Sequence, residues 1–397
     1  MMRVTNNLLF STGTAAMQSQ QQEMLKVQEQ GNGYRTNRPS DDPTGVYRHM
    51  IFSSDLSGVQ SLKKTTQSAA ERLTLADSHM SQIHDALLEA QDMVLQMGES
   101  MLDGSPTILK AAAEKPLSWY QDMIGSANTE LDEVPIFGGG KSQAPFGSTN
   151  LTATAVQVQR KGSTALSTAG AGFVGSVTAG QTPGQVPMSV KVTYVAASNQ
   201  YQANVNGTEV FTTPTSLDAN GQLDLGNGVK FTVTGQPQTG DVYYFEVVPK
   251  YQGGSEDRPI RVHSSSTLKG NVTASELFEG TGDYARGVNV LGAMAALRGA
   301  LLRADTKEVA LQLNRIQEAR AQVSDLQGVT GIRNTQVQAV TTTLESDESS
   351  LTKLRADNVE ADLFSVMSNL EQSSQALQVL TATQRQVMNT SLIDFIR

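Results

Sequence analysis

Apolar residues recur along the chain from residue 59 at alternating spacings of three and four, which is the pattern of a coiled-coil seam. At 1.5 Å of rise per residue, a helix over 44–102 would be roughly 90 Å long, beyond the length of an ordinary globular helix. The seam predicts one long helix that needs a partner along its whole length. Its positions are Val59, Leu62, Thr66, Ala69, Leu73, Ala76, Met80, Ile83, Leu87, Ala90, Val94, Met97 and Met101.

Ser40-Asp41-Asp42-Pro43 predicts the start of this long helix. Side-chain oxygens ahead of an early proline accept hydrogen bonds from the free N–H groups of a first helical turn. The same two aspartates could instead be catalytic carboxylates or calcium ligands, but their neighbours favour the cap. Asp103-Gly104-Ser105-Pro106 ends the helix, and a further helix follows with a stripe from Leu117 to Leu131.

The zone over about 143–272 is rich in Gly, Thr, Ser and Val, and alternation replaces the spacing of three and four. Residues 190–195 and 242–248 read as strands. Asn206-Gly207, Asn220-Gly221 and Asn227-Gly228 are natural hairpin turns, because Asn and Gly accept positive φ. The zone predicts a small antiparallel β domain, within which 150–185 cannot be placed.

From about 283 to 397 the helical spacing returns. One stripe runs through Ile316, Ala319, Val323 and Leu326, is interrupted at Gly328 and Gly331, and resumes from Val337 to Leu354. Since a lone amphipathic helix cannot bury its stripe, the two helical ends must close on each other. We predict an α+β fold: a long antiparallel α-helical, coiled-coil-like bundle formed by both chain ends, with an inserted small antiparallel β domain. The expected domains are 1–142, 143–272 and 273–397.

The extreme ends carry thin apolar seams that no domain of their own would cover, and we expect them to form a subunit interface. In the monomer the segments of about 1–40 and 360–397 should be largely disordered, and they should become helical in an assembly. The expected interface residues are Leu8, Leu9, Met17, Met24, Val27, Leu363, Val366, Leu370, Leu377, Leu380, Leu392 and Phe395.

The amino-acid composition argues against several classes of function. Only 38% of the 397 residues are hydrophobic and 5% aromatic, which suits long thin helices better than a thick globular core. The net charge of −9 and the absence of a basic patch argue against a nucleic-acid partner. There are no cysteines, so disulfides, cysteine-ligated zinc and thiol catalysis are excluded. No apolar run of about 18 residues is present, so we expect no membrane span.

The glycine-rich stretch at 138–142 and the four histidines could indicate a phosphate site and a metal site, but neither matches the motif that such a site requires. Gly138-Gly139-Gly140-Lys141-Ser142 resembles a phosphate loop, but Pro135 stands where the motif needs glycine, so we favour a flexible linker. The histidines His49, His79, His84 and His263 show no helical His-Glu-x-x-His pattern, so surface positions are favoured over a metal. We therefore expect neither an enzyme nor a cofactor.

Arg38-Pro39-Ser40-Asp41-Asp42-Pro43 resembles the signature of the hook-associated protein 3 family, a branch of the flagellin family. The opening over 2–6, the Ile136-Phe137-Gly138-Gly139 step and the closing segment over 358–395 are similar to the same family. The resemblance covers roughly 1–142 and 283–397. It implies a secreted structural subunit at the hook–filament junction of the bacterial flagellum. Its implied partners are copies of itself in a ring, the first hook-associated protein, flagellin and a cytoplasmic export chaperone.

Two alternatives stay open. The chain could be flagellin proper, although the Pro-Ser-Asp-Asp-Pro form favours the junction protein. The β domain could also bind a glycan or another surface, with Tyr194, Tyr201, Tyr243 and Tyr244 stacking on sugar.

The resemblance also implies export, unfolded, through the flagellar type III channel. Residues 1–30 lack the basic head and continuous apolar core of a cleavable signal peptide. Protein recovered from culture supernatant should therefore keep its N-terminus, losing at most Met1 or a start methionine, as measured by intact-mass spectrometry. Loss of some twenty residues would contradict export without cleavage.

Overall fold

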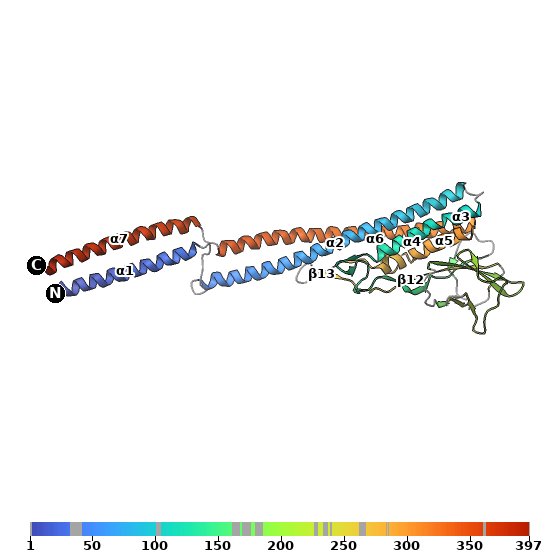
Figure 1. Ribbon diagram of the computed structural model, residues 1–397, viewed down its shortest axis with the longest axis horizontal. Coiled ribbons are helices and arrows are strands. Elements are labelled where there is room, and N and C mark those ends of the chain that lie inside the picture. Colours follow the sequence, from blue (N-terminus) through green and yellow to red (C-terminus); the bar gives the residue numbers. More distant parts are fainter. Residues whose placement is uncertain are drawn as a thin grey trace. The chain divides into compact units, whose positions relative to one another are not determined.

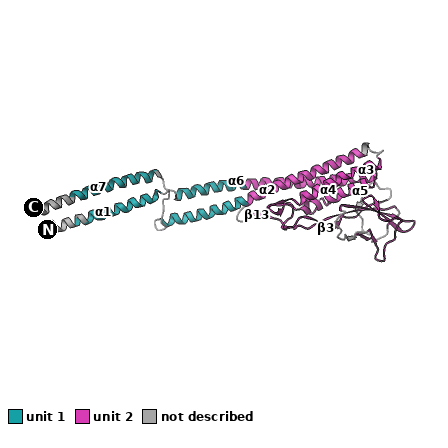
Figure 2. Ribbon diagram, viewed as in Figure 1, with its two compact units in different colours: residues 1–64, 341–397 teal, residues 65–340 magenta. Residues whose placement is uncertain are grey.

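The fold was analysed in a computed structural model. It describes residues 2–31, 42–100, 105–160, 167–168, 176–178, 186–225, 229–232, 237–238, 240–261, 267–282, 284, 286–359 and 363–396. Contacts divide the chain into two compact units, residues 1–64 with 341–397 and residues 65–340 (Figure 2). Helices α2 (Pro43–Ser100) and α6 (Thr306–Val359) contribute to both units.

The first unit holds α1 (Met2–Gln30), α7 (Leu363–Ile396), the start of α2 and the end of α6. Helices α1 and α7 lie side by side and run antiparallel, with the two chain termini at the same end (Figure 1). Lys63 on α2 pairs with Glu348 on α6 at 3.0 Å and with Glu345 at 3.5 Å. Leu56 and Leu344 are buried. Helices from the two halves of the chain therefore pair in this unit, as the sequence predicts.

The helices of the second unit bury the predicted seam. From Thr66 to Met97, every seam position on α2 is buried. The stripe from Ile316 to Leu326 on α6 is buried with it, and α3 (Pro106–Ala112) and α4 (Glu114–Ala127) complete the helical core. Thr74 Oγ1 accepts a hydrogen bond at 3.4 Å from Asn334 Nδ2, so α2 and α6 pack directly. The seam prediction is confirmed over this range.

Helix α6 does not break at Gly328 and Gly331, where its apolar stripe is interrupted. Thr330 occupies the buried position between them, and its hydroxyl donates to Leu326 O at 2.8 Å. The side chain thus meets its polar requirement inside its own helix, which lets the helix continue without an apolar residue at this turn.

Helix α5 (Val290–Leu302) is the centre of the second unit. It is apolar around almost its whole circumference, as expected of a helix enclosed on every side. It packs on α4 and α3 and also on the β strands. At Gly299 the helix comes so close to the sheet that an added Cβ would collide with Ser189 Oγ. Arg298 is the one charged residue within α5.

The sheet is built around β12 (Val242–Tyr251), which pairs antiparallel with β3 (Phe146–Ala153), β4 (Gln157–Gln159) and β7 (Met188–Val195). Along its main path the described strands follow the order β5-β4-β12-β7-β8-β9. The added strands are β5 (Ser167–Thr168), β8 (Gln200–Val205) and β9 (Thr208–Glu209). The two strands predicted from alternation are β7 and β12, and Phe245 faces Val190 in their register.

A second, small sheet of β10 (Gln222–Asp224), β11 (Lys230–Thr232) and β6 (Ser176–Thr178) shares a core with the first. Phe231 stacks on Phe245 with ring centroids 5.4 Å apart and planes 8° from parallel. This core is distinct from the helical core. The remaining strands form short pairs, β1 (Glu130–Leu131) with β2 (Val134–Pro135) and β13 (Pro259–Arg261) with β14 (Thr267–Lys269). Between β14 and α5 lies the π-helical turn η1 (Ser275–Glu279).

The predicted turns have different outcomes. Asn206 and Gly207 have φ of 49° and 82° and join β8 to β9, as expected of a hairpin. Asn220-Gly221 instead closes a local turn in which Asp218 Oδ1 accepts from the N–H groups of Asn220 and Gln222. Asn227-Gly228 lies outside the described residues, but β10 and β11 on either side of it pair antiparallel.

The expectation of a flexible linker at Gly138-Gly139 is wrong. Gly139 is buried with φ of 63°, and an added Cβ there would collide with Gly254 O. Gly138 O accepts from Gly254 N at 3.0 Å, and Gly139 O accepts from Arg258 Nε at 2.7 Å. The glycines serve close backbone approach, so the helical part passes into the β part through a fixed turn.

Leu87 and Leu88 on α2 provide a matched test of the buried seam, since their side chains are 0% and 37% exposed. Leu87→Ala should reduce the free energy of unfolding by about 2–5 kcal/mol, because it leaves a cavity in the helical core. Leu88→Ala should cost about 1 kcal/mol or less. Urea unfolding followed by circular dichroism measures both. Equal losses would show that the seam does not carry the stability of this unit.

Candidate assembly interface

The terminal helices leave their apolar seam half covered. On α7 Val366 is buried, whereas Leu370, Leu377 and Leu380 are only partly buried. On α1 Met17, Met24 and Val27 are partly buried and Leu8 is exposed. Helix α1 packs on α7 along this seam, so most of the predicted interface side chains meet within one chain. The side chains of Leu9, Leu363, Leu392 and Phe395 lie outside the described part of the structure.

Large apolar side chains also project from the outer faces of α1 and α7. Leu25, Phe364, Met367 and Val379 have exposed fractions of 60–85%. At about 100° per residue, those on α7 stand roughly 100–220° around the helix from Val366, away from the seam. Sequence reasoning missed this second set because it searched for a single stripe. Two thin helices with apolar residues on both faces can pack on further helices beside each other.

Asp42 lies at the start of α2. Its Oδ1 accepts a hydrogen bond from Gly45 N at 2.8 Å, and Pro43 is the first residue of the helix. Val46 N donates to Asp42 O at 3.0 Å, which closes the first turn. The Asp42 side chain thus accepts a hydrogen bond from the first turn of the helix, which is the role of an N-cap residue. Ser40 and Asp41 fall outside the described residues.

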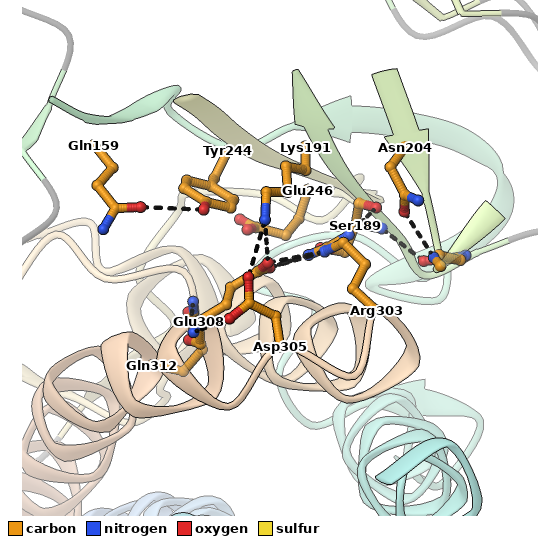
Figure 3. Close-up of polar contacts among 12 residues, drawn as sticks. Gln159, Ser189, Lys191, Asn204, Tyr244, Glu246, Arg303, Asp305, Glu308 and Gln312 are labelled. Atoms are coloured by element: carbon orange, nitrogen blue, oxygen red, sulfur yellow. Dashed lines mark hydrogen bonds and ion pairs between the residues drawn. The ribbon is translucent and has the colours of Figure 1, made fainter. Parts of the chain in front are cut away.

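A buried polar network joins the sheet to the start of α6 (Figure 3). Glu308, 1% exposed, accepts from Lys191 Nζ at 3.2 Å and pairs with Arg303. Arg303 also donates to Ser189 O at 3.1 Å and to Ser189 Oγ at 2.9 Å. Lys191 further pairs with Asp305 at 3.1 Å. One carboxylate therefore holds two cations from different elements, and each cation has further acceptors.

Asp305 has a second task, because its Oδ1 accepts from the N–H groups of Lys307 and Glu308 in the first turn of α6. Burial alone would raise the pKa of Asp305. The Glu308 N–H and the Lys191 ammonium outweigh burial and hold that pKa below its usual value. Asp305 therefore stays ionised as both helix cap and ion-pair partner.

A second ion pair continues the network along β12. Glu246, 2% exposed, receives Arg315 in a bidentate pair with distances of 3.0 and 2.8 Å. Thr154 Oγ1 donates to Glu246 Oε2 at 2.7 Å. Gln312 Oε1 accepts from the same arginine at 3.3 Å. Because its polar groups are matched, this pair fixes orientation between β12 and α6 rather than leaving a buried charge unpaired.

Sequence analysis did not identify this network, although a signal was present. Lys191 and Glu246 are single charges inside otherwise apolar strand patterns, and such a charge inside a sheet needs a partner from elsewhere in the fold. The network joins β7 and β12 to α6. Its role is to hold the sheet on α6 as one body within the second unit.

The tyrosines proposed for sugar stacking are largely inside the β domain. Tyr201, Tyr243 and Tyr244 are buried, and Tyr194 packs on Tyr201 with ring centroids 5.2 Å apart. Burial, and next the neighbouring Tyr194, raises the pKa of Tyr201 to about 12. Tyr244 Oη donates to Gln159 Oε1 at 3.2 Å. Since the strand positions of Tyr201, Tyr243 and Tyr244 face the core, these rings offer no platform for a glycan.

The part of the chain that the structure describes contains no cluster of three or more metal-ligating side chains. Of the four histidines, His49, His79 and His84 are partly buried on α2, and His263 lies outside the described residues. No described helix combines the length and apolarity needed to cross a membrane.

Comparison with known proteins agrees with this geometry. Residues 4–133 match the model of the bacterial flagellin N-terminal helical region. Over 149 residues the chain is 26% identical to flagellar hook-associated protein 3 of Salmonella typhimurium, a match that spans 36% of this chain and 46% of that protein. The fold is similar to a solved structure assigned to the flagellar hook-associated proteins, from Vibrio parahaemolyticus. That similarity has a TM-score of 0.50 and 15% identity, and covers 81% of this chain and all of that one.

The matched region contains α2 with its seam and the Asp42 cap, and it ends at residue 133, before Gly138. The match therefore falls on the helical half whose seam and cap were described above. Over residues 4–133 the chain matches the N-terminal helical region of bacterial flagellins, and it is similar to flagellar hook-associated protein 3.

Proposed function

We propose that the protein is a structural subunit of the bacterial flagellum that joins the hook, through the first hook-associated protein, to the flagellin filament. Its terminal helices form a ring with those of neighbouring copies. The subunit is not an enzyme and needs no cofactor. It is exported with the help of a cytoplasmic chaperone and works outside the cell.

The observation that supports this proposal most strongly is the apolar surface of the α1–α7 pair. Its seam is only partly buried, and Leu25, Met367 and Val379 are exposed on the outer faces. A stable monomeric pair of helices would cover its apolar residues on one side and present polar residues on the other. Further helices from neighbouring subunits would supply the missing cover.

The energetic balance favours the same arrangement. Each large side chain moved from water into a seam contributes on the order of 1.5–3 kcal/mol. Each ordered residue costs about 1–2 kcal/mol in backbone entropy. A lone pair of thin helices therefore lies near balance, and contacts with other subunits decide whether the ends stay ordered. Assembly then supplies the free energy that orders the ends.

Immunogold labelling of intact cells should place the protein at a single point between hook and filament. A junction protein is needed only where the two structures meet, whereas flagellin proper would be labelled along the whole filament. A filament-wide label would support the flagellin alternative and contradict the junction role.

Three consecutive positions on α7 test the assembly mechanism. Leu377→Asp puts a charge in the seam, Val379→Asp puts one on the outer apolar face, and Gln378→Asp is the control at an exposed polar position. The first two should block assembly with little effect on the monomer's melting temperature, because the monomer's cores do not depend on this pair. Cells with either variant should release flagellin and carry hooks without filaments, whereas Gln378→Asp cells should swim.

Hydrogen exchange of the purified monomer gives an independent check. The amides of α1 and α7 should exchange rapidly compared with those of α5, and should become protected on assembly. Normal swimming of Leu377→Asp cells, or full protection of both ends in the monomer, would show that subunit contacts are not what orders the ends.

A further inference from the structure

A cavity of about 550 Å³ lies in the second unit, between α4, α5 and the face of β7 and β8. Its volume falls in the range of about 300–1,000 Å³ that small-molecule sites in proteins occupy. Its wall is of mixed polarity: the apolar side chains include Met188, Val190 and Val205, and the polar ones include Gln121, Asn206 and Thr208. The apolar side chains of this wall can contact the hydrocarbon part of a ligand.

Arg298 of α5 also lines this cavity. Nη1 donates to Pro187 O at 3.3 Å, a long hydrogen bond, and Nε is buried without an acceptor among the described residues. A guanidinium has five N–H donors, so this one can still receive a bidentate acceptor. Burial lowers the pKa of Arg298, and Glu114, which favours its charged form through space, makes no ion pair with it.

Arg298 differs from the neighbouring arginines in having no carboxylate partner among the described residues. Arg303 and Arg315, from the turn after α5 and from α6, each hold a buried carboxylate, Glu308 and Glu246. Arg298 is partly buried, yet the described part of the chain gives it no carboxylate. A partly buried cation without a partner destabilises the fold, and groups left in that condition often serve a ligand.

We propose that this cavity binds a carboxylate carried on an apolar body, with the carboxylate on the Arg298 guanidinium and the hydrocarbon against the apolar side chains of the wall. The guanidinium fork matches a carboxylate in a bidentate pair, which an ammonium would not. The ligand is either a free aliphatic acid or an acidic side chain flanked by aliphatic residues in another protein. Both sources present the same chemistry to the cavity.

Glu209 offers a control of opposite charge for the role of Arg298 in binding. It lines the same cavity but is exposed, and its carboxylate accepts from Gln202 Nε2 at 3.2 Å. Its charge opposes the entry of a second carboxylate. Removing that charge should strengthen binding, whereas removing the Arg298 charge should weaken it, and general damage to the fold would not produce opposite effects.

Titration calorimetry on the full chain would use hexanoate, with hexanol as the uncharged control. The peptide acetyl-Leu-Glu-Leu-amide and its Gln counterpart test the second source. Hexanoate or the Glu peptide should bind more tightly than its uncharged control, and the tighter of the two identifies the source. If neither charged probe binds more tightly than its control, the proposal is wrong.

Single-residue variants then show which side chain is responsible for binding the charged probe. Arg298→Met should weaken binding of the charged probe at least about tenfold. Arg298→Lys should have an intermediate effect, and Glu209→Gln should tighten binding about two- to fivefold. Arg286→Met, in an exposed ion pair outside the cavity lining, should leave binding unchanged.

Melting temperature separates a ligand-binding arginine from a structural one. Arg298→Met should raise the melting temperature of the unliganded protein, because it removes an unpaired charge and fills the site with hydrocarbon of similar length. Unchanged affinity in Arg298→Met, or a lowered melting temperature together with no binding to the unaltered protein, would overturn the proposal.

Discussion

A helix with one apolar stripe cannot bury that stripe by itself, and most of this structure follows from how each helix finds cover. Over 65–340, α2 is covered by α4, α5 and α6, and its seam from Thr66 to Met97 is fully buried. The long helix is stable there because α5, which is apolar on nearly every side, packs between the other helices and the sheet. At the chain ends the described parts of α1 and α7 pack on each other, and their seam stays partly open. The same pattern of spacing thus produces a closed core in one place and an incomplete one in another.

The sheet is held on the helices by charge as well as by apolar packing. Glu308 and Glu246 are almost completely buried, and each is matched by arginine, with hydroxyl, amide or ammonium partners around it. Apolar contacts alone would allow the sheet to slide over α5, because they have little directional preference. Bidentate ion pairs require one orientation. The ion pairs therefore fix how the β insertion is oriented on α5 and α6.

The sequence predicted those features whose cause is local. The spacing of three and four located α2 and its buried face, and Asn206-Gly207 located a hairpin because only a few residues accept positive φ. Features with long-range causes were missed. Gly138 and Gly139 were interpreted as a flexible linker because nothing near them in sequence shows that Gly254 and Arg258 pack there. Tyr243 and Tyr244 follow each other along one strand, and both are buried because the strand has helices on one face and the second sheet on the other.

Features that the chain leaves incomplete point to partners more directly than features that it completes. The Asp42 cap, the Thr330 hydroxyl and the Glu246 carboxylate all have acceptors or donors inside the chain, so each is accounted for by folding alone. The outer face of α7 and the guanidinium of Arg298 are different, since folding leaves Val379 in water and Arg298 Nε without an acceptor among the described residues. Each costs free energy in the isolated chain, because apolar surface in water and buried unpaired donors both destabilise a fold. The two deficits differ in kind, because an apolar face can be covered by another helix, whereas a guanidinium that lines a cavity can be paired by a carboxylate. The interface proposed for α1 and α7 and the site proposed at Arg298 therefore call for partners of different chemistry, and neither needs the other in order to form.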